Sequence, residues 1–207
     1  MSDWEVSITY AVCMPEAPNP AGNRTARREA TPQEARALAH PDRWRIIRLT
    51  LDAALTNKEL AERLGRDPAT TLHHVRTLVA TGFLEAQVAR RGARGAREIP
   101  YRSTGKSWTL DIGEAKDDYS LAIVDAFRAE LLESPPAERH YARLGLRLTR
   151  AQREALEERL DALVEELASM SPADGGEPCA LFVAVHSRPE ALQSKSTKPR
   201  TRRQRGR

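Results

Sequence analysis

Apolar residues recur every three or four positions between residues 31 and 80, and this spacing predicts a series of short amphipathic helices. Capping signals indicate where these helices begin. Thr31 is followed by a proline and an early acid, while Thr56 and Glu59 have the spacing of a capping box. Glycine after a last turn indicates where a helix ends. The predicted helices cover residues 32–40, 42–53, 57–64 and 68–80.

The last two of these helices are joined by a tight turn, Gly65 to Asp67, and together predict a helix-turn-helix. Asp67 is a suitable cap, and Pro68 is a suitable first residue for the helix that follows. Helical spacing divides that helix into two faces. The inner face consists of Thr71, Val75, Leu78 and Val79. The outer face consists of Ala69, Leu72, His73 and Arg76, with Thr70 beside them.

Beyond Gly82 the apolar period changes from helical to alternating, which predicts two β-strands. The strands cover residues 83–88 and 99–103, and the loop between them carries Arg90, Arg91, Arg94 and Arg97. Because Pro100 has no N–H group, we expect its strand at a sheet edge. A helix-turn-helix followed by such a basic hairpin is the arrangement of a winged helix.

Three stretches resemble the winged-helix domain of the arsenic-repressor-like (ArsR-like) bacterial transcription regulators. They are ALAHPDRWRIIRL, LTNKELAERLGRDPATTLHHVRTLVATGFLE, and the hairpin that ends in IPYRST, together spanning residues ~35–105. The resemblance implies that residues 68–80 are the recognition helix and that the protein binds operator DNA as a two-fold dimer. Metal-sensing members carry Cys-x-Cys where this chain has Ala61 and Arg63, so thiolate metal sensing is not supported here.

The outer face of the recognition helix has the chemistry needed to read DNA. Such a helix fits the major groove, and its first residues reach base edges while nearby backbone N–H groups favour phosphate. Arg76 suits a bidentate contact to guanine, and the hairpin arginines suit the minor groove or flanking phosphates. Taken singly, an arginine run or a histidine pair is also typical of a solvated surface, but their order along the chain favours function. The candidate DNA-binding residues are Ala69, Thr70, Leu72, His73, Arg76, Arg90, Arg91, Arg94 and Arg97.

Charge is segregated along a chain whose net charge is only +4. Residues 31–110 contain 14 basic and 8 acidic residues, and residues 188–207 contain 8 basic residues and one acid. Residues 111–187 contain 16 acidic and 8 basic residues. The basic parts indicate a polyanionic partner, expected to be double-stranded DNA, and the acidic part indicates a separate role.

The acidic region is predicted to be helical. A helix beginning at Asp117 or Asp118 and ended by two prolines has one apolar face, made of Tyr119, Ile123, Ala126, Phe127 and Leu131. A longer helix over Thr149–Ser169 has a heptad seam of Leu156, Leu160, Leu163 and Leu167. About two heptads are too few for an isolated coiled coil, so the seam packs either on a second copy or on the winged helix. We expect the homodimer, since a two-fold protein reads two half-sites. An unknown small-molecule effector is a further candidate partner.

The two ends of the chain flank this organisation. Alternation over Trp4–Val12 predicts a strand, and residues 16–28 have the composition of a linker, although disorder of this terminus is an equal alternative. A second strand is predicted over Ala180–His186, and residues 194–207 are expected to be disordered. The fold is therefore mainly α with a small β-hairpin wing. Its expected parts are an N-terminal strand or linker (1–30), a winged-helix DNA-binding domain (31–110), a helical C-terminal region ending in a strand (111–187), and a basic tail (188–207).

Several other classes of protein are disfavoured. No apolar run is long enough for a membrane span or suited to export, so a cytoplasmic protein is expected. The 2 cysteines form no CxxC pair, and His140, Cys179 and His186 follow no ligand spacing, so no metal site or cofactor is predicted. Catalytic motifs such as GxSxG, HExxH or a phosphate-binding glycine loop are absent, which disfavours an enzyme. The hypothesis is a dimeric, repressor-like regulator that binds an inverted repeat; the alternative is a winged helix that binds RNA or protein with non-specific polyanion affinity.

Overall fold

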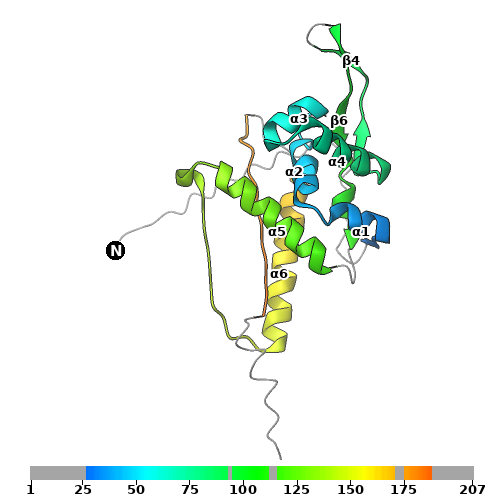
Figure 1. The fold of residues 1–207 in the computed structure, drawn as a ribbon. Coiled ribbons are helices and arrows are strands. Elements are labelled where there is room, and N and C mark those ends of the chain that lie inside the picture. The colour runs from blue at the N-terminus through cyan, green and yellow to red at the C-terminus, as the bar shows by residue number, and fades with distance from the viewer. Residues whose placement is uncertain (1–26, 93–94, 112–115, 171–174, 188–207) are drawn as a thin grey trace, which may run out of the picture.

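The computed structural model describes residues 27–92, 95–111, 116–170 and 175–187. The predicted strand over Trp4–Val12, the basic tail and Arg94 of the hairpin lie outside these ranges. Figure 1 shows two parts, a winged-helix body packed around a core and, beyond it, an open C-terminal arm. The name "body" is used below for residues 27–134 and "arm" for residues 139–187.

The first two helices of the body begin where their caps predict. α1 (Pro32–Leu38) starts at a complete capping box, in which the Thr31 and Glu34 side chains each accept a hydrogen bond from the other residue's backbone N–H. α2 (Pro41–Leu49) ends about a turn earlier than predicted. The reason is local, because Thr50 donates its hydroxyl to carbonyls of the last turn and the chain then leaves the helix axis.

α3 (Asn57–Leu64) and α4 (Pro68–Ala80) form the helix-turn-helix with the predicted boundaries. The turn between them requires a left-handed residue, and Gly65 provides it with a φ of 61°. Thr56 caps α3, and Asp67 caps α4. The predicted helix-turn-helix is therefore confirmed at both of its helices.

The core of the body lies between these helices and a small sheet. Its largest fully buried side chains include Leu38, Ile46, Leu60, Leu78, Phe83 and Leu84, which come from α1, α2, α3, α4 and the chain after α4. Full burial of a side chain of this size stabilises a fold by ~1.5–3 kcal/mol. The helix-turn-helix is thus held in place by the same cluster that holds the sheet.

The sheet of the body has three strands in the order β2 (Leu55–Thr56), β6 (Pro100–Ser103), β3 (Leu84–Ala86), all antiparallel. β6 is therefore central, and the prediction that Pro100 marks an edge strand is wrong. Proline is tolerated because it is the first residue of β6, opposite Thr56 at the end of β2. A strand as short as β2 has no periodicity of its own, so the sequence pattern could not reveal this pairing.

The hairpin that projects from the body in Figure 1 has a second ladder at its outer end, β4 (Arg90–Arg91) with β5 (Arg97–Glu98). The N–H of Gly92 donates to the carbonyl of Ala96 at 2.7 Å and closes the ladder. The loop is therefore shorter than predicted, because Arg90, Arg91, Arg97 and Glu98 lie on paired strands.

The start of the body is fastened by a carboxylate. β1 (Arg28–Glu29) pairs in parallel with β7 (Leu110–Asp111), which follows the short helix η3 (Lys106–Thr109). Glu34 lies 2.6 Å from the guanidinium of Arg28 and 2.6 Å from the ammonium of Lys106. Hydrogen bonds from these two cations hold the pKa of Glu34 well below its usual range. Arg28, predicted as the end of a linker, is thus part of the fold.

α5 (Lys116–Glu133) packs against α2 and α1, as Figure 1 shows. The ring of Tyr119 meets that of Trp44 edge to face, with 5.2 Å between centroids, and Glu133 pairs with Arg45 of α2. All the predicted apolar-face residues of this helix are buried or half-buried. α5 therefore lies on the body, and the short helix η4 (Pro136–Glu138) follows it.

The arm consists of α6 (Arg150–Ser169) between two extended segments, residues 140–148 and 176–187. α6 begins at its predicted cap, Thr149, and contains no buried residue. The strand predicted over Ala180–His186 is absent, because this extended segment pairs with no other strand among the described residues. A β-strand needs a neighbour to bond its backbone groups, and the described part of a single chain supplies none. Among the described helices, none combines the length and apolar character that a membrane span requires.

Candidate nucleic-acid interface

Helix α4 turns its predicted outer face to solvent. Ala69, Thr70, His73 and Arg76 are exposed, and Leu72 is half-buried. Within the described part of the chain, the guanidinium of Arg76 has no hydrogen-bond or ion-pair partner. The residues that could contact a ligand are therefore accessible and are not occluded by the arm.

The buried face of α4 differs slightly from the predicted one. Thr71, Val75 and Leu78 are fully buried as expected, but Val79 is 36% exposed and His74 is buried in its place. At 100° per residue, Val79 lies ~80° from Thr71 around the helix and His74 lies ~60° away on the other side. The buried stripe is thus centred between Thr71 and His74, and Val79 falls at its margin.

The start of α4 is capped from within the chain. The carboxylate of Asp67 accepts hydrogen bonds from the backbone N–H groups of Ala69 at 2.8 Å and Thr70 at 3.2 Å. These donors are the ones expected to favour phosphate, and they are already bonded. Side chains of the outer face are therefore the main donors that α4 offers to a polyanion.

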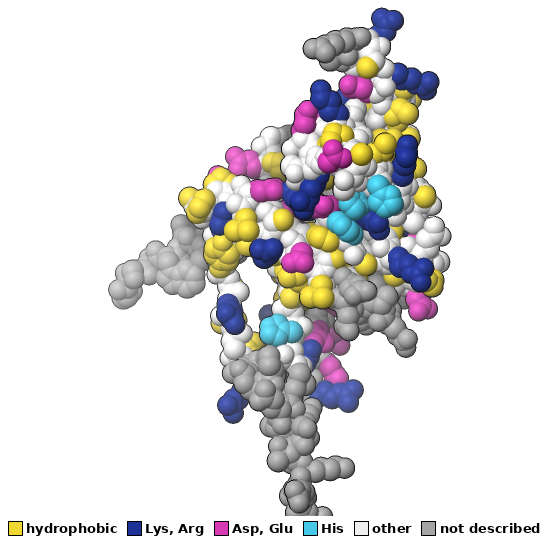
Figure 2. Space-filling view, in the orientation of Figure 1, with side chains coloured by type: hydrophobic (Ala, Val, Ile, Leu, Met, Phe, Trp, Pro, Cys, Tyr) yellow, Lys and Arg dark blue, Asp and Glu magenta, His cyan; other side chains and the backbone are white. Residues whose placement is uncertain are grey.

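A polar cluster below the outer face fastens α4 to α2. Arg43 donates its Nε–H to Nδ1 of His74 at 3.3 Å, and its Nη1 donates to the carbonyls of Arg36 and Ala37 at 3.1 Å. The rings of His40 and His74 have centroids 4.3 Å apart. Figure 2 shows a group of histidine side chains at the surface of the body. These contacts hold the rotation of α4 about its axis and hence the direction of its outer face.

Burial favours the neutral form of both imidazoles of this cluster. Burial, followed by the charges of His40 and Arg43, lowers the pKa of His74 from 6.5 to about 4. Burial also lowers the pKa of His40. A neutral His74 can accept the hydrogen bond from Arg43, whereas an imidazolium cannot.

The same cluster contains the one group of described residues whose ligand atoms gather as a metal site would require. Atoms of His40, Asp42 and His74 lie within 4.8 Å of one another. However, Arg66 donates to both oxygens of Asp42, at 3.0 and 3.4 Å, and Arg43 donates to His74. Two guanidinium groups in contact with the ligands repel a cation. The cluster is therefore suited to fastening helices and poorly suited to holding a metal.

The hairpin is fastened to the helix-turn-helix through one of its arginines. The guanidinium of Arg90 lies 2.7 Å from Glu59 on α3 and 3.9 Å from Glu98 on the opposite strand. Arg90 was predicted as a DNA contact, but Glu59 and Glu98 neutralise much of its positive charge within the chain. It sets the direction of the hairpin relative to α3.

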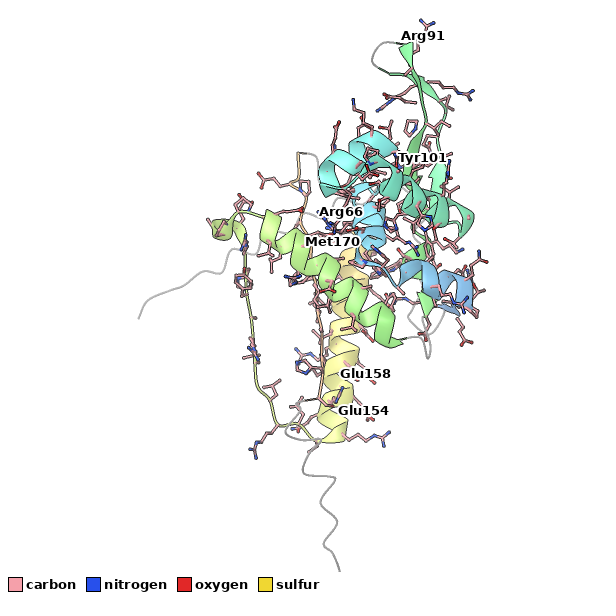
Figure 3. All side chains as sticks on the ribbon, in the orientation of Figure 1. Arg66, Arg91, Tyr101, Glu154, Glu158 and Met170 are labelled. Carbon is pink, nitrogen blue, oxygen red and sulfur yellow. The ribbon has the colours of Figure 1, made fainter. Side chains whose placement is uncertain are left out.

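The end of the hairpin carries unpaired positive charge. Arg91 and Arg97 lie directly opposite each other in the β4–β5 ladder, both are exposed, and neither has an ion-pair partner among the described residues. Figure 3 shows Arg91 at the outer end of the hairpin. Like charges directly across a ladder destabilise it. A bound phosphate would remove this repulsion, so the arrangement favours a polyanionic ligand.

The predicted dimerisation seam lies apart from this interface, on α6. Leu156, Leu160 and Leu167 are half-buried, and Leu163 is 41% exposed. The seam is therefore only partly covered within the described chain. His140, Cys179 and His186 are exposed and form no cluster of ligand atoms in the described part of the chain.

Sequence reasoning missed the residues that support the outer face. His40, Arg43 and Arg66 received no role, although a histidine directly before Pro41 stands where a helix cap belongs. The backbone N–H of Asp42 does donate to Nδ1 of His40, at 3.2 Å. The pairing of Arg90 with Glu59 joins residues 31 positions apart, and no local signal indicates it.

Comparison with known proteins places this interface in a recognised domain. Residues 38–87 match a family model described as a helix-turn-helix domain. No curated protein matches the chain. The match extends from the last residue of α1 through β3 and confirms the resemblance of this segment to the helix-turn-helix of winged-helix regulators.

Solved structures with similar folds include three bacterial proteins. The homodimeric winged helix-turn-helix DNA-binding domain of Mb0332 from Mycobacterium bovis, a possible ArsR-family transcriptional regulator, is 22% identical; 53% of this chain and 85% of that chain are covered, with a TM-score of 0.30. Lactococcus lactis ZitR in complex with DNA is 18% identical, with 61% and 73% covered and a TM-score of 0.27. The adhesin competence repressor AdcR from Streptococcus pyogenes is 17% identical, with 61% and 80% covered and a TM-score of 0.27. At these scores, the argument for function rests on the geometry of this chain.

Proposed function

Since residues 38–87 form a helix-turn-helix domain that resembles those of ArsR-like regulators, we propose that this protein is a sequence-specific DNA-binding transcriptional regulator without catalytic activity. Helix α4 enters the major groove, where Thr70, His73 and Arg76 contact base edges and Leu72 contacts a thymine methyl group or the sugar wall. The hairpin lies along the neighbouring backbone or minor groove.

One observation carries this proposal. The outer face of α4 is exposed and its Arg76 is unpartnered in the described residues, while the opposite face is fixed by the core and by the His40–Arg43–His74 cluster. A reading surface needs both properties, because specific hydrogen bonds require free donors at a fixed angle. Ala69 at the start of this face has no bulk to hold α4 away from the floor of the groove.

The hairpin contributes affinity more than sequence choice. Arg91 and Arg97 are exposed and carry no partner in the described part of the chain, so they can neutralise phosphates and release counterions. Arg94, which lies outside the described residues, would add to the same charge. Arg90 contributes less, because Glu59 and Glu98 already neutralise it.

The protein acts as a homodimer on an inverted-repeat operator, in the manner of a repressor. Two copies place two α4 helices on half-sites about one helical turn, ~34–36 Å, apart. The unburied seam of Leu156, Leu160, Leu163 and Leu167 provides apolar surface for such a dimer. The unknown small-molecule effector considered for the C-terminal region would act by changing the distance between the two α4 helices.

Selection from a random duplex pool tests the proposal directly. We expect enrichment of an inverted repeat by the full chain, and relaxed choice at the base pair that Arg76 contacts when Arg76 is replaced by Ala. Binding that is equally strong on every duplex and falls steeply with salt would contradict sequence-specific reading. Preference for RNA over the selected duplex would instead support the alternative RNA-binding module.

A further inference from the structure

The extended segment 140–148 of the arm has the features of a β-strand without a partner. Leu144, Leu146 and Leu148 alternate with Arg143, Gly145 and Arg147, which gives one apolar and one basic face. The three leucines are 79%, 50% and 41% exposed. In the described structure, no backbone group of residues 140–148 makes a hydrogen bond. Exposed alternating leucines and unpaired backbone groups indicate a segment that another strand completes.

The second extended segment of the arm is held at two points and keeps apolar side chains exposed. Phe182 stacks on Phe127 of α5 with 4.8 Å between ring centroids, and Ser187 accepts a hydrogen bond from Arg153 of α6 at 3.0 Å. The alternate residues Leu181, Val183 and Val185 are 63%, 43% and 40% exposed. This extended segment is therefore fixed against α5 through Phe182 and against α6 through Ser187, while Leu181, Val183 and Val185 remain exposed.

We propose that these segments pair between two copies of the chain: residues 143–148 of one copy add as a β-strand to residues 180–186 of the other, and reciprocally. This exchange deepens the homodimer of the proposed function and specifies its interface. Each resulting sheet has one apolar face, made of Leu144, Leu146 and Leu148 together with Leu181, Val183 and Val185. The two-fold axis brings the two apolar faces together, so that they bury each other as in a β-sandwich.

Complementary charges on the segment 140–148 and on α6 favour a second copy of this chain as the partner that covers the arm. Arg143 and Arg147 lie on the basic face of the first segment, while Glu158 and Glu166 lie exposed on α6; none of the four has an ion-pair partner in the described residues. Figure 3 shows Glu158 on α6. The two arginines are about 13 Å apart along a strand, and the two glutamates are about 12 Å apart along a helix. A strand added beside residues 180–186, which lie along α6, places the arginines opposite these acids.

Measurements on the full chain without DNA test the exchange. We expect a monomer–dimer equilibrium by sedimentation between about 1 and 100 µM, with the amides of residues 143–148 and 180–186 exchanging at least about tenfold more slowly in the dimer than in the monomer. A chain that stays monomeric overturns the inference. A dimer whose 143–148 amides remain unprotected overturns it as well, as does protection of both segments in the monomer, which would mean pairing within one chain.

A pair of variants separates this interface from other apolar surface. Replacing Leu144 and Leu146 by Lys should weaken dimerisation at least about tenfold, because it places charge on the face that the dimer buries. The matched control replaces by Lys two leucines of α5, Leu121 and Leu132, whose side chains are 66% and 63% exposed. It should leave the equilibrium unchanged. Equal effects of the two pairs, or a larger effect of the control, overturn the inference, and unchanged circular dichroism of the monomers verifies that both fold.

A charge exchange tests the choice of partner surface. Replacing Arg143 and Arg147 by Glu should weaken the dimer, and adding Glu158→Arg and Glu166→Arg should restore at least half of the loss in Kd. Failure to restore it overturns the placement on α6. Because these readouts involve no DNA, they can fail while operator selection succeeds, or succeed while it fails.

Discussion

The body and the arm are made from the same chain but satisfy their physical requirements differently. In the body, amphipathic helices bury their apolar faces in one core, and a three-stranded sheet pairs its strands. In the arm, the longest described helix buries no residue, and two extended segments have no strand partner among the described residues. The body buries its apolar side chains within a single chain, whereas the arm leaves exposed the apolar surface that the proposed dimer would cover.

This contrast separates the two tasks of the proposed regulator. Reading a base sequence requires a rigid surface, and the body supplies it by fixing α4 with Val75, Leu78 and the His74–Arg43 bond. Assembly on two half-sites requires a surface that becomes buried when two copies meet. The described arm supplies exposed leucines and, in residues 140–148, backbone groups without hydrogen bonds. Substitutions in the two parts should therefore differ in whether they cost stability, affinity or neither.

The largest effect is expected in the core. Phe83 is 1% exposed at the centre of the body, and replacing it with Ala should lower the free energy of unfolding by ~3–5 kcal/mol through lost burial and a residual cavity. Leu163→Ala on α6 should change it by no more than ~0.5 kcal/mol at concentrations where the chain is monomeric. Urea unfolding followed by circular dichroism measures both. A cost above ~1 kcal/mol for Leu163→Ala would mean that α6 is part of the body's cooperative core.

Acid should destabilise the body through His74. Its pKa is 6.5 when unfolded and about 4 when folded, so the unfolded state binds the proton more readily and stability falls as the pH decreases from 6.5 toward 4. At ~1.36 kcal/mol per pKa unit, the difference between 6.5 and about 4 amounts to roughly 3 kcal/mol. His74→Gln keeps an acceptor for Arg43 but does not titrate, so its unfolding free energy should depend less on pH over this interval. Equal pH dependence of the variant and the parent would place the acid sensitivity elsewhere.

Loss of a reading side chain should cost affinity without stability. Arg76→Ala should weaken binding to the selected operator by ~1–3 kcal/mol and relax the choice of base at one position, because the guanidinium contacts a guanine there. Non-specific binding should change little. Arg128→Ala, which removes an exposed arginine from α5, is the matched control and should leave operator affinity unchanged. Fluorescence anisotropy on specific and scrambled duplexes measures both; a uniform loss on all duplexes would mean that α4 reads through another face.

Local signals were sufficient to predict most of the body. Thr56 with Glu59, Gly65, and Asp67 with Pro68 each act within a few residues, so the boundaries of α3 and α4 follow from sequence alone. The role of Pro100 was misjudged because β2 is defined only by its pairing with β6. Similarly, the burial of His74 in place of Val79 depends on which side of α4 meets α2, and helical periodicity fixes that only to within about one position.

The exposed residues of the interface could be predicted from the sequence, whereas the contacts that hold the interface in place could not. Arg76 and Arg91 could be singled out because a free charge needs only exposure and position. The contacts of Arg43 with His74 and of Arg90 with Glu59 join residues 31 positions apart, and only the folded chain brings them together. In the arm, the strand expected over residues 180–186 fails for a related reason, because a strand is completed by its neighbour.

The smallest effect is expected from removing a helix cap. The body and the arm each contain a capping box that begins with threonine. Thr56 and Thr149 each form a capping box, with Glu59 in the body and Gln152 in the arm. Thr56→Ala should lower the free energy of unfolding of the body by ~1 kcal/mol, since its helix is part of the core. Thr149→Ala should fray the first turn of α6 and slightly reduce helical circular dichroism, while the unfolding midpoint of the body stays the same. The threonine hydroxyl accepts the same backbone hydrogen bond in both places, so a difference between the two variants reports how far each helix shares in cooperative folding. An equal shift of the midpoint would show that body and arm unfold as one unit.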